Sequence, residues 1–428
     1  MNRTQQLLEA GRQTQLAALP QERDSLPLEG ALELLLQHAP TVTESEEVPL
    51  FDADGRICFA HVRANLPQPP YDRVQVDGYA LRSADIASAS PDHPVMLLVT
   101  QHLYAGDAPG QPLEPGQAAR VTTGAVLPQG ADCVVWQEDT LADSQTVVIS
   151  RSLAAMRNCR MRGQDMERGS LLAESGDVLH SGTLSLLAGQ GHAHVRVFRR
   201  PRVSLLATGS ELVLPGAPWP LGGMYNIGST LLGLRLRKMG ARIMHMLTRG
   251  DNRRELQAYM AEMLATSDLV ITTGGASVGP KDLVSGIAAD LTTQQGGSVL
   301  FQSLRLKPGS MTLAAALPQS LLLGLSGNPV AAAATFGLLA VPVLKKIGGA
   351  TRFAPVRQTA VARNDFGSIR KDERRIVLAR LEGKDVYFAR DAQRMGQPAL
   401  CDDCNCFVDI AAGSGPVRKG MEVDVILA

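Results

Sequence analysis

The sequence predicts an α/β fold in which a doubly wound parallel sheet is accompanied by smaller β domains. Between about residues 201 and 347, strand-like apolar runs alternate with helix-like segments, a pattern typical of a parallel sheet with helices on both faces. From about 60 to 160, and again from about 350, short β-type runs are separated by Gly, Pro and Asp turns. A chain of 428 residues with 45% hydrophobic residues is long enough for two to four such cores.

The elements follow in order along the chain. Residues 1–18 predict an amphipathic helix that ends before Pro20, and residues 27–39 predict a second helix with a stripe of leucines. The runs "PVMLLVTQHL", "AARVTTGAVL", "ADCVVWQEDT" and "SQTVVISRS" predict a small antiparallel β domain. We expect its turns to carry any function that it has.

The alternating region begins with the strand "RVSLLATGSEL". The segments that follow are a helix near 226–239, the strand "RIMHML", a helix capped by Asn252, the strand "DLVITTGG", a further helix, two strands near 299–316, the strand "SLLLGLSG" and the helix "PVAAAATFGLLAVPVLKKIGG". Open sheets of this kind bind ligands beyond the carboxyl ends of their strands. The loops at those ends are therefore the first place to look for a site.

Charge and hydropathy exclude several classes of function. Lys and Arg together number 42 and balance 42 Asp and Glu, so the basic surface of a nucleic-acid or anionic-membrane binder is not expected. The N-terminus has no signal-peptide core, and the longest apolar stretch, Val330 to Leu344, is interrupted by Pro342 and too short to span a bilayer. We expect a cytoplasmic protein whose six cysteines are reduced.

Three loops at strand ends predict an anion or phosphate pocket. They are Thr208–Glu211, Thr273–Ser277 and Ser326–Pro329. Glycines let backbone N–H groups approach an oxyanion, hydroxyls add donors, and Asn328 can cap a helix whose positive end faces the same crevice. The alternative is that such glycine-rich turns only join strand to helix. Three of them at one sheet edge favour the pocket.

Charged residues stand beside these loops. Glu211 and Asp282 adjoin the predicted donors, and an acid next to a phosphate pocket commonly holds a divalent metal such as Mg²⁺. Surface helix caps are the alternative. Lys307, in "LKPGSMT", follows a strand and precedes a Pro-Gly turn, where a lysine can neutralise an anion. For Lys307 the alternative is a solvated side chain.

From about residue 26 to the end, the chain resembles the molybdopterin molybdenumtransferase family, which includes the MoeA proteins and the gephyrin E domain. The resemblance rests on seven motifs in the family's order. They read "PPYDRVQVDGYALR", "RVTTGAVLPQGADCVV", "NCRMRGQD", "LLATGSEL", "TTGGASVGPKD", "LKPG" and "GLSGNPVA".

The resemblance implies an elongated, usually dimeric multidomain protein with a MoaB/MogA-like doubly wound α/β domain and smaller β domains. Its active cleft would lie between the α/β domain of one subunit and the β domain of the other. The implied domains are an N-terminal helical extension (1–25), a discontinuous linker and dimerisation domain (26–62 and 163–200), a small β domain (63–162), a molybdopterin-binding α/β domain (201–347) and a C-terminal β domain (348–428).

The implied reaction is insertion of molybdate into adenylylated molybdopterin with release of AMP, assisted by Mg²⁺ or another divalent cation. A homodimer is implied, with other cofactor-biosynthesis proteins as further partners. By motif, the catalytic residues are Asp77, Thr123, Asp165, Glu211 and Lys307. The metal ligands are Glu211, Asp251 and Asp282. The substrate-binding residues are Gly274, Gly275, Ser277, Ser310, Gly327, Asn328 and Arg370.

The chain also departs from the family pattern. Ser310 replaces the second lysine of the KPGKP motif, Arg73-Val74 replaces the usual Asn-Ser, and the C-terminal serine motif is replaced by "RMGQPALCDDCNCF". Cys401, Cys404 and Cys406 in that segment are either a soft-ligand site for zinc or molybdenum, or simply three reduced thiols, the reading that we favour. Two functions follow: a molybdenum insertase with an altered anion site, or an impaired paralogue that acts as a pterin-nucleotide carrier, scaffold or sensor.

Overall fold

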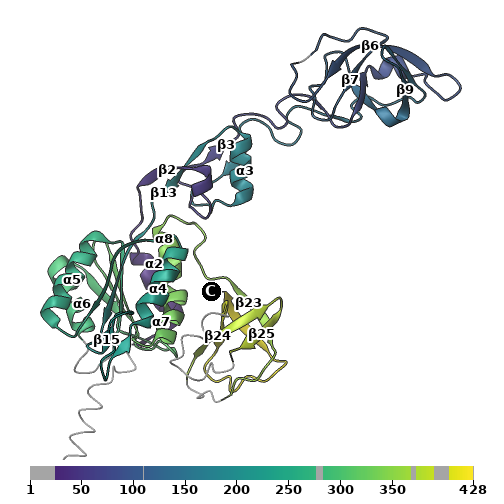
Figure 1. The fold of residues 1–428 in the computed structure, drawn as a ribbon. Helices are drawn as coiled ribbons and strands as arrows, with labels where there is room; N and C mark the ends of the chain where they lie inside the picture. The colour runs from purple at the N-terminus through teal and green to yellow at the C-terminus, as the bar shows by residue number, and fades with distance from the viewer. Residues whose placement is uncertain (1–24, 109, 276–282, 368–372, 390–403, 428) are drawn as a thin grey trace, which may run out of the picture. The chain divides into compact units, whose positions relative to one another are not determined.

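The protein divides into two compact units (Figure 1). The computed structural model describes residues 25–108, 110–275, 283–367, 373–389 and 404–427. One unit contains the described residues up to Phe59, Ser175–Leu179 and those from Val195 onward; the other contains Ala60–Glu174 and His180–His194. The helix expected at residues 1–18 lies outside the described residues.

The first unit contains the α/β sheet that the sequence predicts. Its strand order is β17-β14-β18-β22-β21-β19. The first four strands are parallel, whereas β21 runs antiparallel to both of its neighbours, β22 and β19, so the doubly wound sheet is mixed at one edge. Its strands are β14 (Arg202–Thr208), β17 (Arg242–Arg249), β18 (Leu269–Thr273), β19 (Ser298–Phe301), β21 (Leu313–Ala316) and β22 (Leu321–Leu325).

Helices cover both faces of this sheet, with α5 and α6 on one side and α2, α4 and α7 on the other (Figure 1). Alternate residues of a strand point to opposite faces, and the two cores divide β18 accordingly: Leu269 and Ile271 enter one, Val270 the other. Burial on both faces explains why these strands are continuous apolar runs. The helices are α2 (Leu28–His38), α4 (Ile227–Lys238), α5 (Arg253–Thr266), α6 (Val284–Gln295), α7 (Pro329–Thr335) and α8 (Val341–Ile347).

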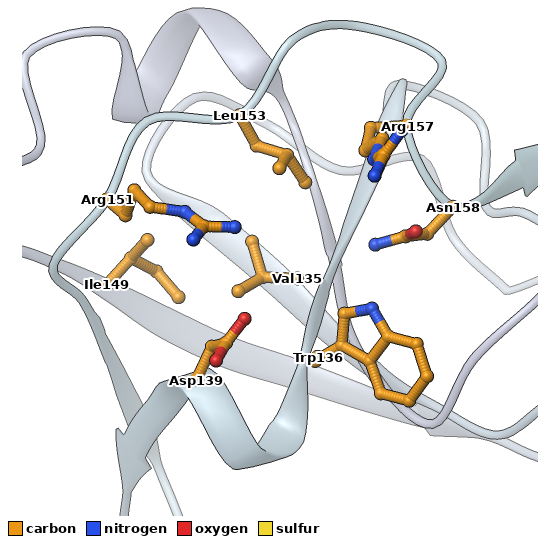
Figure 2. Close-up of a pocket in the computed structure, with 8 residues that line it drawn as sticks. All are labelled: Val135, Trp136, Asp139, Ile149, Arg151, Leu153, Arg157 and Asn158. Carbon is orange, nitrogen blue, oxygen red and sulfur yellow. The ribbon is translucent and has the colours of Figure 1, made fainter.

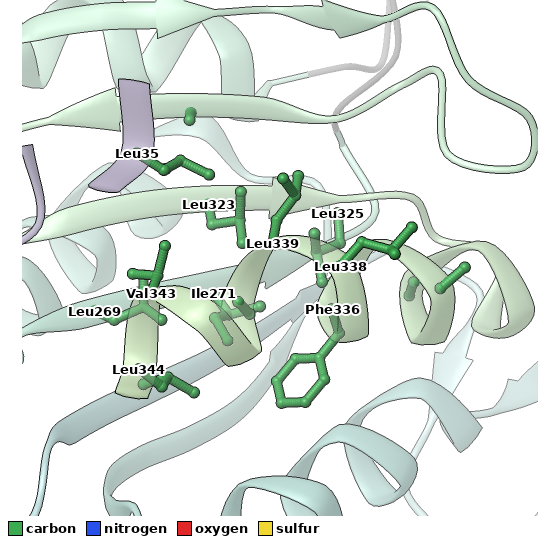
Figure 3. Packing of buried hydrophobic residues seen from close by; sticks show 14 of the residues in the cluster. Leu35, Leu269, Ile271, Leu323, Leu325, Phe336, Leu338, Leu339, Val343 and Leu344 are labelled. Carbon is green, nitrogen blue, oxygen red and sulfur yellow. The ribbon is translucent and has the colours of Figure 1, made fainter. Parts of the chain in front are cut away.

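The largest core lies between β18, β22 and the α7–α8 helix, where Phe336 is fully buried among leucines (Figure 3). Pro342 does not interrupt this helix, contrary to the sequence expectation. It occupies the start of α8, just after the π-helical turn Phe336–Ala340, where a missing backbone donor is tolerated. Pro329–Ile347 is thus long and apolar enough to cross a membrane, but most of it is buried inside the fold, as in a core helix.

The C-terminal region forms a closed barrel in the order β23-β25-β24-β26-β27. Ion pairs connect helix α2 to the barrel, because Arg374 donates to both Glu29 of α2 and the largely buried Asp409. Arg357 also contacts both acids. The barrel strands are β23 (Arg357–Ala362), β24 (Arg375–Glu382), β25 (Asp385–Phe388), β26 (Cys406–Ile410) and β27 (Glu422–Leu427).

This network predicts an acid-sensitive contact at Glu29. The hydrogen bond from Arg374 is the main cause that lowers the pKa of Glu29 from 4.5 to about 2. A carboxyl with a lowered pKa stabilises the fold above its ordinary pKa, and this stabilisation disappears as the pH falls through the folded value. Glu29→Gln should therefore be less stable than the parent at neutral pH, with the difference shrinking between pH 4.5 and about 2.

Urea unfolding across that range measures the difference. Because the Glu29 side chain is 57% exposed, we expect a small effect. Glu33→Gln on the same helix is the matched control, since the Glu33 carboxylate forms no ion pair with a described residue and accepts a hydrogen bond only from Gln37 among them. A pH-independent difference for Glu29→Gln would contradict the role of the ion pair.

The second unit contains a six-stranded sheet in the order β8-β5-β7-β6-β10-β9. It is mostly antiparallel, as expected, but β6 and β7 are parallel. Apolar cores cover its two faces. Its strands are β5 (Gly78–Leu81), β6 (Val95–Leu103), β7 (Gln117–Val121), β8 (Cys133–Trp136), β9 (Thr140–Ala142) and β10 (Thr146–Ile149).

Short elements complete the chain. The two-stranded pairs are β1 (Ser25–Leu26) with β20 (Ser303–Leu304), β2 (Ser45–Pro49) with β13 (His194–Phe198), β3 (Val62–Arg63) with β12 (Leu171–Ala173), β4 (Arg73–Val74) with β11 (Cys159–Arg160), and β15 (Leu212–Val213) with β16 (Met224–Tyr225). The short helices are η2 (Leu50–Asp52), η3 (Ser83–Ile86), η4 (Gln137–Asp139) and α3 (Ser181–Gly189). His194 begins β13, whereas His192 lies in the preceding turn against Asn65, so the two histidines do not share a strand face.

Candidate anion and metal site at the strand ends

The three glycine-rich loops meet at the carboxyl ends of β14, β18 and β22. A Cβ added to Gly274 would lie 2.3 Å from the Thr208 carbonyl oxygen, and one added to Gly275 would lie 2.9 Å from Thr208 Oγ1. A Cβ on Gly327 would lie 3.4 Å from the Gly274 Cα. The loops are therefore in contact, and at Gly274 the approach to the Thr208 backbone is one that only glycine allows.

Thr208 lies at the centre of this contact, a role that the sequence did not reveal. Its side chain is 5% exposed, and Oγ1 has no hydrogen-bond partner within the described part of the chain. A buried hydroxyl without a partner costs about 1 to 3 kcal/mol. Such an atom, placed beside Gly275, fits a loop built to receive an acceptor such as a phosphate oxygen.

The backbone donors are fewer than the sequence suggested. The Gly274 N–H donates to the Leu325 carbonyl at 3.2 Å, so Gly274 permits close approach rather than offering a donor. Asn328 caps α7 as expected, but its Oδ1 accepts from the N–H groups of Val330 and Ala331. Among the described residues, the N–H groups of Gly275 and Gly327 have no backbone acceptor. Within the described part of the chain, these two N–H groups and the Thr208 hydroxyl are donors for which no acceptor is present.

Two acids lie at the same edge. The Glu211 carboxylate folds back over Gly209, since a Cβ there would lie 2.6 Å from Glu211 Oε1. Asp251 is fixed by Ser210, whose backbone N–H and hydroxyl both donate to Asp251 Oδ2, at 3.1 and 2.9 Å. Ser210 thus positions the acid, a function that spacing alone does not show. Glu211 and Asp251 are both exposed and available to a cation.

Lys307 and Ser310 lie in one turn packed against α7. A Cβ on Gly309 would lie 2.3 Å from Thr335 Cγ2, which places this turn at the far end of α7 from Asn328. Seven helical residues rise by about 10 Å, so Lys307 belongs to a separate subsite rather than to the glycine loops. Lys307 Nζ donates to Glu373 Oε1 at 2.5 Å. Sequence reasoning missed this partner, which comes from the C-terminal region.

Asp77 and Thr123 form a pair in the second unit. The backbone N–H and the hydroxyl of Thr123 both donate to Asp77 Oδ1, at 2.7 and 2.8 Å. Gly78 is required beside them because its Cβ would lie 1.9 Å from the Val135 carbonyl oxygen. Asp165 is held separately by the guanidinium of Arg160, which sequence reasoning also missed. That these residues face a second subunit stays a prediction.

Some expected residues lie outside the described part of the chain, namely Ser277, Asp282, Arg370 and Cys401. Of the other cysteines in that cluster, Cys406 is buried and its thiol donates to the Ala379 carbonyl at 3.2 Å. Burial, with a smaller effect of Cys404, raises the pKa of the Cys406 thiol to about 12. A thiol that stays protonated favours the interpretation as a reduced core cysteine over a metal ligand.

Comparison with known proteins places these observations in one family. The family model described as the MoeA N-terminal region (domain I and II) matches residues 26–191, and a probable molybdopterin binding domain matches residues 204–346. The molybdopterin molybdenumtransferase of Bacillus subtilis is 31% identical over 413 residues, 95% of this chain and 95% of its own. The chain belongs to the molybdopterin molybdenumtransferase family.

Further relatives cover the same length. The molybdopterin molybdenumtransferase of Staphylococcus aureus is 29% identical over 412 residues, 95% of this chain and 96% of its own. The crystal structure of the molybdopterin biosynthesis MoeA protein of Pyrococcus horikoshii superposes with a TM-score of 0.81 at 30% identity, over 94% of this chain and 99% of that one. The fold and the family resemblance are therefore confirmed.

Asn226 shows how this molybdopterin molybdenumtransferase homologue keeps its local structure. It is buried and caps α4, accepting from the Ser229 N–H at 2.9 Å. Its amide also donates to Thr248 Oγ1 at 2.8 Å, at the end of β17 and three residues before Asp251. Sequence reasoning missed this role, although an asparagine just before a predicted helix is a signal that could have found it.

The Asp77–Thr123 pair yields a test in this family member. The backbone N–H of Thr123, followed by its hydroxyl, lowers the pKa of Asp77. Thr123→Val removes only the hydroxyl bond, so the pKa of Asp77 should rise part of the way toward its ordinary value. Carboxyl NMR titration of the full chain measures this shift. Thr122→Val is the control, because the Thr122 hydroxyl accepts from Ala105 instead; an equal shift there would contradict the assignment.

Proposed function

We propose that the protein inserts molybdate into adenylylated molybdopterin and releases AMP. The observation that carries the proposal is the convergence of the three strand-end loops on Thr208. It occurs in a chain that matches the molybdopterin molybdenumtransferase of Bacillus subtilis over 95% of that enzyme's length. A site for a pyrophosphate needs donors that approach without side chains in the way. The Gly275 and Gly327 N–H groups and the Thr208 hydroxyl have this arrangement.

The proposed site has two subsites, one at each end of α7. The glycine loops would hold the pyrophosphate of the adenylylated pterin, and the Lys307 turn, about one helix length away, would receive the molybdate oxyanion. Backbone donors that are fixed before the substrate arrives stabilise developing negative charge without reorganisation. Asp77, Thr123 and Asp165 of a second subunit would complete the cleft, and Thr123 lowers the pKa of Asp77.

The acids at the sheet edge fit a divalent cation. Mg²⁺ commonly binds one or two carboxylates together with substrate phosphates, and Glu211 and Asp251 provide two carboxylates at the loop edge. Asp282 completes the expected set but lies outside the described residues. When bound, Mg²⁺ would supply positive charge against the pyrophosphate. Ser210 would keep Asp251 in place for this role.

The alternative, an impaired paralogue that only binds the pterin nucleotide, is not favoured by the comparisons. Relatives named as transferases match nearly the whole chain, and Glu211, Asp251 and Lys307 are all present. We further propose that the enzyme works as a cytoplasmic homodimer, in which each cleft uses both subunits. A monomer in analytical ultracentrifugation that still releases AMP would contradict the shared cleft.

The direct test is product formation. Purified protein is incubated with adenylylated molybdopterin, molybdate and Mg²⁺, and AMP and molybdenum cofactor are followed together. We expect both to appear in equal amounts. If the protein binds the nucleotide tightly but releases no AMP above the blank, the result would contradict the proposed enzyme and support the pterin-nucleotide carrier.

Glu211→Gln tests the cation. Removing one carboxylate charge should raise the Mg²⁺ concentration for half-maximal AMP release by at least about tenfold, while saturating Mg²⁺ restores part of the rate. Glu255→Gln, on the first turn of α5, is the control for a nearby lost charge. An unchanged Mg²⁺ dependence of Glu211→Gln would remove this acid from the metal site.

A further inference from the structure

A small pocket in the second unit combines cationic side chains with an apolar floor (Figure 2). Its volume is about 100 Å³, and Val135, Ile149 and Leu153 line it from the core side. Drug-sized ligands occupy about 300 to 1,000 Å³, so a pterin nucleotide does not fit. One water occupies about 30 Å³. The pocket therefore has room for a single small polyatomic ligand.

The polar side chains of the pocket are mainly donors. The guanidinium groups of Arg151 and Arg157 line it, together with Asn158 and Trp136. Figure 2 shows the Arg151 guanidinium and the Asn158 amide pointing toward each other across the pocket, with the indole of Trp136 beside Asn158. Asp139 is the one acid among the lining residues, so the two arginines leave an excess of positive charge.

Arg151 and Arg157 are both exposed, and no described residue neutralises either of them. Within the described residues, the side chains of Arg151 and Arg157 form no ion pair or hydrogen bond, whereas other arginines of this unit do, such as Arg160 with Asp165 and Arg63 with the Gly169 carbonyl. Guanidinium groups bind oxyanions through paired N–H donors. Two of them at one pocket favour a ligand with several acceptor oxygens.

The turn that carries Arg157 is held in an unusual conformation. The residues on both sides, Met156 and Asn158, have backbone φ angles of 69° and 60°, which residues other than glycine rarely adopt. The turn is fixed from β8, because Val134 N–H donates to the Arg157 carbonyl at 3.1 Å and the Asn158 amide donates to the Val134 carbonyl at 2.8 Å. Strain that the surroundings maintain is common at binding sites. Here it fixes Arg157 and Asn158 next to Trp136.

We propose that this pocket binds one small tetrahedral oxyanion, of the phosphate, sulfate or molybdate class, between Arg151 and Arg157. The site is separate from the glycine loops and from Lys307, all of which belong to the other unit. It does not depend on the proposed enzymatic function. Its donors are the two guanidinium groups, the second amide hydrogen of Asn158 and the Trp136 indole N–H.

Tryptophan fluorescence tests the proposal in the full chain. The protein has two tryptophans, so Trp219→Phe leaves Trp136 as the single reporter inside the pocket. Phosphate, sulfate and molybdate are titrated separately at constant ionic strength, with chloride as the blank. We expect a saturable signal for at least one dianion, and the lowest Kd identifies the ligand. Lys307→Ala must leave this signal unchanged.

Substitutions of arginines inside and outside the pocket distinguish a specific anion site from nonspecific electrostatic attraction. Arg157→Gln and Arg151→Gln should each weaken binding by about tenfold or more. Arg168→Gln, an exposed arginine of the same unit outside the pocket, should have little effect. Equilibrium dialysis with labelled phosphate and molybdate counts the bound anions independently of fluorescence. If no dianion saturates in either measurement, or if Arg168→Gln weakens binding as much as Arg157→Gln, the pocket is not an oxyanion site.

Discussion

Gly274→Ala is expected to reduce AMP release by at least about a hundredfold, because the added methyl cannot be accommodated without separating the loops. Its Cβ would lie 2.3 Å from the backbone oxygen of Thr208 and 3.2 Å from Thr208 Oγ1. Backbone atoms at the end of a buried strand cannot shift as a flexible side chain can. Any relief must therefore displace Thr208 or Gly275, which carry the proposed phosphate donors.

The conformation of Gly274 adds a second cost. Its φ of 81° is left-handed, which costs an alanine about 1 kcal/mol, and the clash adds about 1 to 3 kcal/mol. Gly296→Ala separates the two effects, because Gly296 has a φ of 75° but open space around its Cβ. This control should lose only about 1 kcal/mol of unfolding free energy and keep its activity.

AMP release and urea unfolding are measured on both variants. Full activity of Gly274→Ala, with a stability loss equal to that of Gly296→Ala, would show that the loops do not need their close approach. A Gly274→Ala variant that is folded but inactive would support the need for this close approach. The nucleotide affinity should fall together with the rate, since both depend on the same donors.

The local features of the α/β unit were predictable because each has a short-range cause. Apolar runs buried on both faces mark β14, β18 and β22, and the glycines after them mark the strand ends. The caps at Asn252 and Asn328 were equally visible, since a side-chain oxygen needs only the next three residues to act. This is why the sheet edge could be located from the sequence.

Other features depend on long-range contacts that spacing does not encode. The reversed direction of β21 is decided by how the chain returns to the sheet edge, not by the composition of the strand. The Gly274 N–H is not available to a ligand because it donates to the carbonyl of Leu325, which lies on the neighbouring strand. The pairing of Lys307 with Glu373 joins residues 66 positions apart. A motif identifies the lysine, but only the fold shows what already neutralises it.

That ion pair predicts opposite effects for its two members. In the structure the Lys307 ammonium lies 2.5 Å from a Glu373 carboxylate whose side chain is 16% exposed, so an incoming dianion meets a neutral pair rather than a free cation. Lys307→Ala removes the cation of this turn, and the KM for molybdate should rise about a hundredfold. Glu373→Gln frees the ammonium, and the KM for molybdate should fall below that of the parent.

The double variant shows whether the Glu373 carboxylate repels the oxyanion or positions Lys307. If the carboxylate acts by repulsion, Lys307→Ala combined with Glu373→Gln should have a lower KM for molybdate than Lys307→Ala alone, and the two changes should not be additive. Ser310→Lys tests the opposite change, a gain of positive charge. It adds a second cation to the same turn, so it should also lower the KM for molybdate. Thermal unfolding of each variant controls for stability. If Glu373→Gln raised the KM for molybdate as Lys307→Ala does, the carboxylate would be holding the lysine in place for the anion rather than opposing it.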